Sequence, residues 1–107
     1  MKNNLTGTTF KSPYNTEYIV LAGYENDSIV FAEKDNIDAP LWFACDAKIE
    51  NSRLYSSYKV SYTVSKHEFF NGFDSTDPVN SLKKKYYKIP TIFLKLIIEL
   101  YFYERGI

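Results

Sequence analysis

Residues 53–64, RLYSSYKVSYTV, carry the clearest structural pattern in the chain. Apolar or aromatic residues alternate with mostly polar ones, which is the period of two expected of a strand with one face buried and one in water. The segment therefore predicts a half-buried antiparallel strand. Its expected buried face carries Leu54, Tyr58, Val60, Tyr62 and Val64, and its expected polar face carries Tyr55, Ser57, Lys59, Ser61 and Thr63.

The residues before this segment predict four further strands. Each is a short run of β-branched, aromatic or apolar residues bounded by turn-forming residues such as Gly, Pro, Asn, Asp and Ser. Because short loops join neighbouring strands in antiparallel fashion, we expect an antiparallel sheet of four or five strands. The expected strands are 8–10, 18–22, 29–32 and 41–45, and the expected loops include 25–27, 35–40 and 50–52.

Two helix-start signals follow the strands. Residues 65–68, SKHE, have the hydroxyl and carboxylate spacing of a capping box and predict a helix over 66–71. Asp77 followed by Pro78 predicts a second helix over 78–88, because Asp caps free N–H groups and proline fits the first helical position.

Residues 91–104 fit two periods. Their apolar residues alternate as in a strand, whereas Thr91, Lys95 and Glu99 recur every four residues, as along one stripe of a helix. A strand of this length would be unusually long, so a helix is favoured. The expected fold class is α+β in a single domain over 1–107: the antiparallel sheet, with an SH3-like, partly closed barrel as one variant, followed by two or three C-terminal helices packed on it.

The charge is balanced overall and uneven along the chain. Thirteen basic and thirteen acidic residues give a formal net charge of zero, so no global field attracts a polyanion. Residues 17–50 hold eight acids and two lysines, whereas residues 51–107 hold nine bases and five acids. The strand region is therefore acidic and the C-terminal region is basic.

Few groups suit catalysis or metal binding. His67 is the one histidine, and neither Cys-x-x-Cys nor His-x-x-x-His occurs. Cys45 is the one cysteine; its apolar surroundings and the neighbouring Asp46 are typical of a packing thiol rather than a nucleophile. We therefore expect no catalytic residue, no metal and no cofactor. The alternative is a small ribonuclease-type toxin that uses His67 as general acid or base.

Residues 83–88, KKKYYK, are the best nucleic-acid signal in the sequence. Lysines neutralise phosphates, and tyrosine rings stack on unpaired bases. The alternatives are a solvated helix face and a contact surface for an acidic protein partner. We call this segment the Lys/Tyr patch; its members are Lys83, Lys84, Lys85, Tyr86, Tyr87 and Lys88.

The expected function is that of a non-enzymatic domain that binds another protein. In size, composition and lack of a catalytic set the chain is similar to small phage or mobile-element inhibitors of host defence enzymes. An inhibitor of a nucleic-acid-handling enzyme would present carboxylates in place of phosphates. The alternative is a small nucleic-acid-binding barrel that uses the Lys/Tyr patch. The acidic candidates for partner binding are Glu25, Asp27, Glu33, Asp35 and Asp38.

The apolar run over 89–103 bears on membranes and on oligomers. It is shorter than the roughly 20 residues that a bilayer requires, and Lys95 and Glu99 interrupt its centre, so it predicts no membrane span. The first ten residues lack the apolar core of a signal peptide, which predicts a cytoplasmic protein. Apolar residues over 92–102 predict either a cover for the sheet or a homodimer contact.

Overall fold

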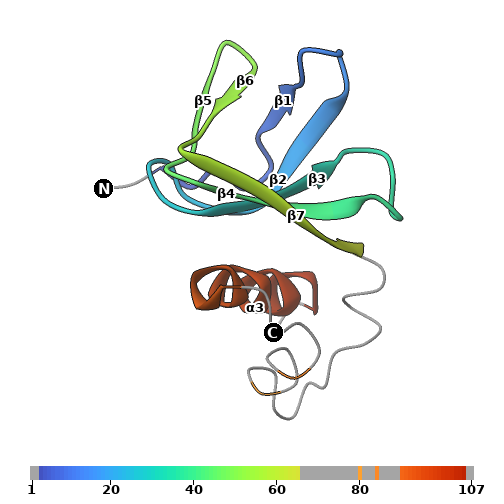
Figure 1. Ribbon diagram of the computed structural model, residues 1–107, viewed down its shortest axis with the longest axis vertical. Helices are drawn as coiled ribbons and strands as arrows, with labels where there is room; N and C mark the ends of the chain where they lie inside the picture. The colour runs from blue at the N-terminus through green and yellow to red at the C-terminus, as the bar shows by residue number, and fades with distance from the viewer. Residues whose placement is uncertain (1–2, 66–79, 81–83, 85–89, 106–107) are drawn as a thin grey trace.

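The computed structural model describes residues 3–65, 80, 84 and 90–105, without the side chains of 62–65, 91 and 100–105. In these residues the fold is an antiparallel five-stranded sheet followed by a C-terminal helix, and a two-stranded hairpin is inserted before the last strand (Figure 1). The sheet order is β1-β2-β3-β4-β7. The elements are β1 (Thr9–Lys11), β2 (Glu17–Gly23), β3 (Ile29–Glu33), β4 (Pro40–Cys45), β5 (Lys48–Glu50), β6 (Arg53–Tyr55), β7 (Tyr58–Ser65) and α3 (Thr91–Arg105).

The expected antiparallel sheet is confirmed, but the strand predicted over 53–64 is wrong in one respect, because it is two strands. β6 pairs with β5, and β7 pairs with β4. Residues 56 and 57 separate the two strands. At this interruption the Ser57 N–H donates to the Cys45 carbonyl oxygen at 3.1 Å, and the Ser57 hydroxyl donates to the Asp46 carboxylate. The break escapes a pattern search because both strands keep apolar residues at even-numbered positions.

The break also changes which side chains share a face. Leu54 packs on one side of the sheet and Val60 on the other, although the alternation places them together. Tyr58, expected on the buried face, is 52% exposed. The prediction of one continuous buried face is therefore wrong for both Leu54 and Tyr58.

The sheet is buried on both faces, and this gives the protein two apolar cores. β2 has a bulge at Leu21: Val20 pairs with Phe31 and Ala22 pairs with Val30, so two residues of β2 oppose one of β3. As a result, the side chains of Val20 and Ala22 point to opposite faces of the sheet and lie in different cores. The helix-side core contains Ala22, Val30, Ala32, Leu41, Phe43, Phe93, Leu94, Leu96 and Ile97. The core on the opposite face, the hairpin-side core, contains Phe10, Val20, Ile29, Phe31, Ala44 and Ala47.

The helix predicted over 91–104 is present as α3, which lies across the sheet face opposite the β5–β6 hairpin (Figure 1). Phe93 is buried, and its ring centroid lies 4.8 Å from that of Phe43 on β4. Lys95 and Glu99 are exposed, as the four-residue spacing predicts. The helices predicted over 66–71 and 78–88 lie outside the described residues, apart from residues 80 and 84, which are helical.

The helices in the described part of the chain were also compared with the dimensions of a bilayer. None of them is both long enough and apolar enough to span a membrane.

Candidate functional site

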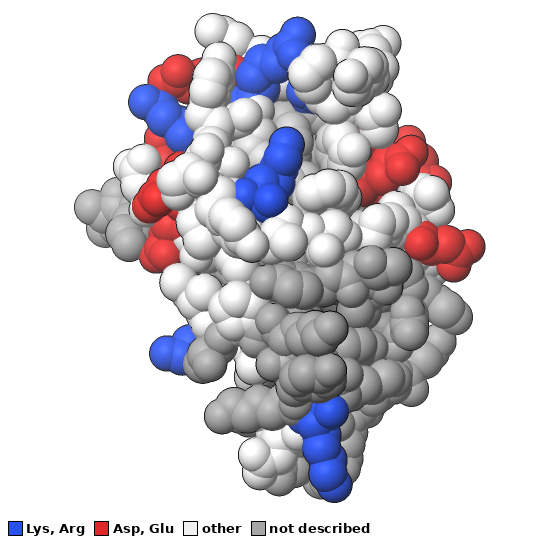
Figure 2. Space-filling view, in the orientation of Figure 1, with Lys and Arg blue, Asp and Glu red and all other residues white. Residues whose placement is uncertain are grey.

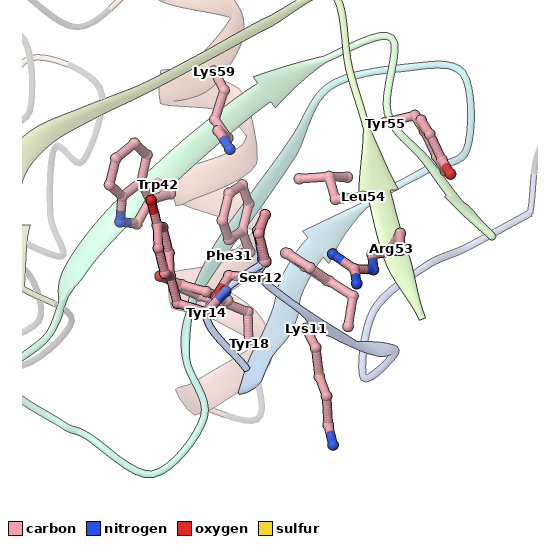
Figure 3. A pocket seen from close by; sticks show the side chains of 12 residues that line it. Lys11, Ser12, Tyr14, Tyr18, Phe31, Trp42, Arg53, Leu54, Tyr55 and Lys59 are labelled. Carbon is pink, nitrogen blue, oxygen red and sulfur yellow. The ribbon is translucent and has the colours of Figure 1, made fainter. Parts of the chain in front are cut away.

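A cavity of about 590 Å³ lies on the sheet face opposite α3, between the β5–β6 hairpin and the β1–β2 hairpin (Figure 3). Its volume is within the range of small-ligand sites. Aromatic and basic side chains dominate its lining, so we call it the aromatic–basic cleft. The aromatic lining residues are Phe10, Tyr14, Tyr18, Phe31, Trp42 and Tyr55, and the basic ones are Lys11, Arg53 and Lys59.

Four aromatic rings form a continuous chain across the floor of the cleft. Phe10 stacks on Tyr18 at a centroid distance of 5.5 Å and meets Phe31 edge-on at 5.1 Å. Phe31 stacks on Trp42 at 6.3 Å, with 14° between the ring planes. These four residues come from β1, β2, β3 and β4 in order, so the sheet register sets their spacing. Trp42 is half-buried and presents part of its ring to the cavity.

The β5–β6 hairpin forms one wall. Its two-residue turn, Asn51 and Ser52, has positive φ at both positions (51° and 62°), which is the geometry of a type I′ turn. The Lys11 N–H donates to the Ser52 carbonyl oxygen at 2.8 Å and joins the hairpin to β1. Leu54 packs into the hairpin-side core, so the hairpin folds over the sheet and places Arg53 at the cleft.

The loop between β1 and β2 forms the opposite rim and is held by a local hydrogen-bond network. The Ser12 hydroxyl accepts the N–H groups of Tyr14 and Thr16, each at 3.2 Å. Ser12 N–H donates to the Thr16 carbonyl at 2.9 Å, and Asn15 N–H donates to the Ser12 carbonyl at 3.0 Å. This fixed loop presents Tyr14, which is 91% exposed, at the edge of the cleft.

The charges at the cleft are all of one sign. No Asp or Glu lines it among the described residues. Lys59 points into the cavity from β7 and Arg53 points inward from the hairpin, whereas Lys11 extends away (Figure 3). On the face shown in Figure 2, basic side chains lie at the top and centre as well as at the upper left, lower left and bottom, and acidic ones lie toward the two sides. The cleft therefore suits an anionic ligand that has a flat, apolar part.

The acidic residues predicted to bind a partner lie in two groups, at the two ends of β3. Glu25 and Asp27 lie in the turn between β2 and β3, and Glu25 accepts a hydrogen bond from the Asn3 amide at 2.7 Å. Glu33, Asp35 and Asp38 lie at the end of β3 and in the loop to β4. The length of β3 separates the two groups. A protein partner that reads these carboxylates stays a prediction.

The other sequence candidates are only partly described. Within the Lys/Tyr patch the structure describes Lys84 alone, which is exposed; Lys83, Lys85, Tyr86, Tyr87 and Lys88 lie outside the described residues, as does His67. Cys45 packs against the helix-side core, with the Ser28 hydroxyl 3.9 Å from its sulfur. The described His, Cys, Asp and Glu residues include no group of three that could hold a metal ion.

The predicted dimer surface on 92–102 is largely used within the chain. Phe93, Leu94, Leu96 and Ile97 are buried against the sheet, and Ile92 is the large apolar residue of α3 that remains exposed among those whose side chains are described. A homodimer through this helix stays a prediction, and these four buried residues would not be part of its interface.

Of the residues that form the cleft, the sequence indicates only Tyr14 and Tyr55, as exposed tyrosines of the kind that anchor protein interfaces, and it does not bring them together in one site. The strand β5, which begins the hairpin wall, was also missed, because Lys48-Ile49-Glu50 is too short to show a period. One feature of the sequence points toward the cleft. The polar face predicted for 53–64 contains Lys59, whose side chain lines the cleft from β7.

Comparison with known proteins adds no further constraint on this site. No protein-family model, curated protein or solved structure matches the chain.

Proposed function

We propose that the protein binds single-stranded nucleic acid in the aromatic–basic cleft. The observation that carries this proposal is the presence, in one cavity, of an aromatic floor with the rings of Tyr18 and Trp42 partly exposed, and of two inward-pointing cations, with no carboxylate among the described lining residues. Unpaired bases stack on aromatic rings, at about 1–3 kcal/mol for each base, and the phosphates between them attract lysine and arginine.

The same lining disfavours other ligand classes. Aromatic cages also bind quaternary ammonium groups, but Arg53 and Lys59 would repel such a cation. A nucleic-acid duplex keeps its bases stacked inside the helix, so it would offer the cleft only phosphates. A single strand offers both an anionic phosphate and a flat, apolar base, which are the two features that the cleft suits.

As part of this proposal, the sheet and the β5–β6 hairpin form a small, partly closed barrel of the SH3-like kind. Its support is the hydrogen bond between Lys11 and Ser52, which brings β6 beside β1 over the hairpin-side core. Small barrels commonly bind oligonucleotides on a curved strand face.

The fluorescence of Trp42 tests the proposal directly, because Trp42 is the one tryptophan in the chain. An oligothymidylate of about ten nucleotides is within the site sizes of single-strand-binding barrels. We expect it to quench Trp42 as it binds, and we expect a duplex of equal length to bind more weakly with little quenching. Polyglutamate, a polyanion without bases, is the control for charge alone.

The same titration separates this site from the Lys/Tyr patch. A variant with Lys83, Lys84, Lys85 and Lys88 changed to Gln should retain binding and quenching, whereas Lys59→Gln should weaken both. Equal affinity for duplex and single strand, or binding that is lost only in the four-lysine variant, would contradict a site in the cleft.

A further inference from the structure

We infer that a bound strand crosses the cleft from β6 to β7, with one phosphate at Arg53, another at Lys59, and its bases stacked on the accessible rings between them, Tyr18 and Trp42. This inference rests on the proposed function, and it adds the path of the strand and the number of phosphates that the cleft engages. It follows from the placement of the two cations relative to the sheet.

The two cations enter the cleft from opposite edges of the sheet. Arg53 belongs to β6, which the Lys11–Ser52 hydrogen bond holds beside the outer strand β1. Lys59 belongs to β7, the other outer strand, where it pairs with Ala44 of β4. Strands lie about 4.8 Å apart, so the outer strands are about 19 Å apart along a flat sheet and closer across this curved one.

The aromatic floor occupies the strands between them. Tyr18 on β2 and Trp42 on β4 are half-buried and flank the buried Phe31 of β3, so a path from Arg53 to Lys59 passes over two accessible aromatic rings. The order along this path is cation, rings, cation. A nucleic-acid strand has the matching order of phosphate, base and phosphate, and a free mononucleotide with one phosphate does not.

Both cations are available to a ligand. Among the described residues, Lys34 pairs with Glu17 at 3.3 Å and Lys48 pairs with Glu50 at 2.9 Å, whereas Arg53 and Lys59 form no ion pair and are exposed. Glu50 faces Arg53 across the hairpin, but its carboxylate forms an ion pair with Lys48. Two anchoring phosphates are therefore expected at the cleft itself.

The salt dependence of binding counts these phosphates. For a single strand, the logarithm of the association constant falls with the logarithm of the salt concentration by about 0.7 for each phosphate contacted. We expect Arg53→Gln and Lys59→Gln each to reduce the slope for an oligothymidylate by about 0.7, and to weaken binding about tenfold. The double variant should lose about 1.4. Lys95→Gln is the control, because it removes an exposed lysine of α3, on the opposite face of the sheet from the cleft, and should leave the slope unchanged.

The result also separates this inference from the proposed function. If the oligothymidylate quenches Trp42 but only one of the two variants, or neither, lowers the slope, the two-anchor path is overturned and binding in the cleft stands. If the oligothymidylate neither binds nor quenches, the proposed function itself fails. A slope reduced equally by Lys95→Gln would also overturn the path, because the charge effect would then be general.

Discussion

Phe31 on β3 and Trp42 on β4 face each other across two neighbouring strands, with ring centroids 6.3 Å apart and nearly parallel planes. Phe31 is buried and belongs to the hairpin-side core, whereas Trp42 is half-buried and opens onto the cleft. A buried ring therefore fixes the position of the ring that a ligand would contact.

Trp42→Ala should weaken binding of a labelled oligothymidylate about tenfold, because one stacking surface is lost. Trp42→Phe should recover most of the affinity, since a ring is restored on the same support. Fluorescence anisotropy measures both variants, and urea unfolding checks that Trp42→Ala still folds. Equal affinities for Trp42→Ala and the unchanged protein would contradict a role for this ring in stacking.

Tyr14→Ala should weaken the same binding about five- to tenfold, by loss of a stacking surface at the rim. Its free energy of unfolding should change by less than about 0.5 kcal/mol, because Tyr14 is 91% exposed. Tyr14→Phe should bind almost normally. Tyr24→Ala serves as the control, because Tyr24 is an exposed tyrosine outside the cleft lining and its loss should leave binding intact.

Ser12→Ala removes the hydroxyl that accepts the N–H groups of Tyr14 and Thr16. We expect a loss of about 1 kcal/mol in the free energy of unfolding and weaker binding through a less fixed rim. Ser56→Ala, at an exposed serine between β6 and β7, should change neither quantity. Unchanged hydrogen exchange at the Tyr14 and Thr16 amides in Ser12→Ala would show that the hydroxyl does not hold the loop.

Gly23→Ala should destabilise the protein by about 2–4 kcal/mol in urea unfolding. Gly23 has φ 130°, and a Cβ there would lie 2.5 Å from the Ser28 carbonyl oxygen and 2.6 Å from the Ile29 Cγ2 atom. Gly7→Ala is the matched control: Gly7 also has positive φ, but a Cβ added there would meet nothing within 4 Å. We expect Gly7→Ala to lose only about 1 kcal/mol, so similar losses at both sites would contradict the steric argument.

Phe93→Ala should lower the free energy of unfolding by about 3–5 kcal/mol, because Phe93 is fully buried between α3 and the sheet and contacts Phe43. Ile92→Ala, one residue earlier and 49% exposed, should change it by less than about 0.5 kcal/mol. The comparison measures how much α3 contributes as a cover for the sheet. Equal effects at the two positions would mean that the helix does not pack by the face described.

Local patterns predicted most of the strands and the helix α3. The strands predicted over 18–22, 29–32 and 41–45 match β2, β3 and β4 within two residues at each end, and the four-residue spacing of Lys95 and Glu99 identified the exposed stripe of α3. These features depend on residues close in sequence, where the period of the backbone decides which side chains share a face.

The apolar–polar alternation predicted the wrong face for side chains at two places where a strand is irregular. The bulge at Leu21 places Val20 and Ala22 in different cores, and the break at Ser57 does the same for Leu54 and Val60. A count of odd and even positions cannot detect either interruption, because the hydrogen bonds that make them join residues distant in sequence.

The sequence by itself determined a run of antiparallel strands, their main turns, and a C-terminal helix with one polar stripe. Only the tertiary structure decided that the β5–β6 hairpin folds onto β1, and that Tyr14, Trp42, Arg53 and Lys59 share one cavity. The physical reason is that periodicity fixes the face of a side chain within one strand, whereas strand pairing and packing between distant segments decide which faces meet. The cleft exists only at that second level.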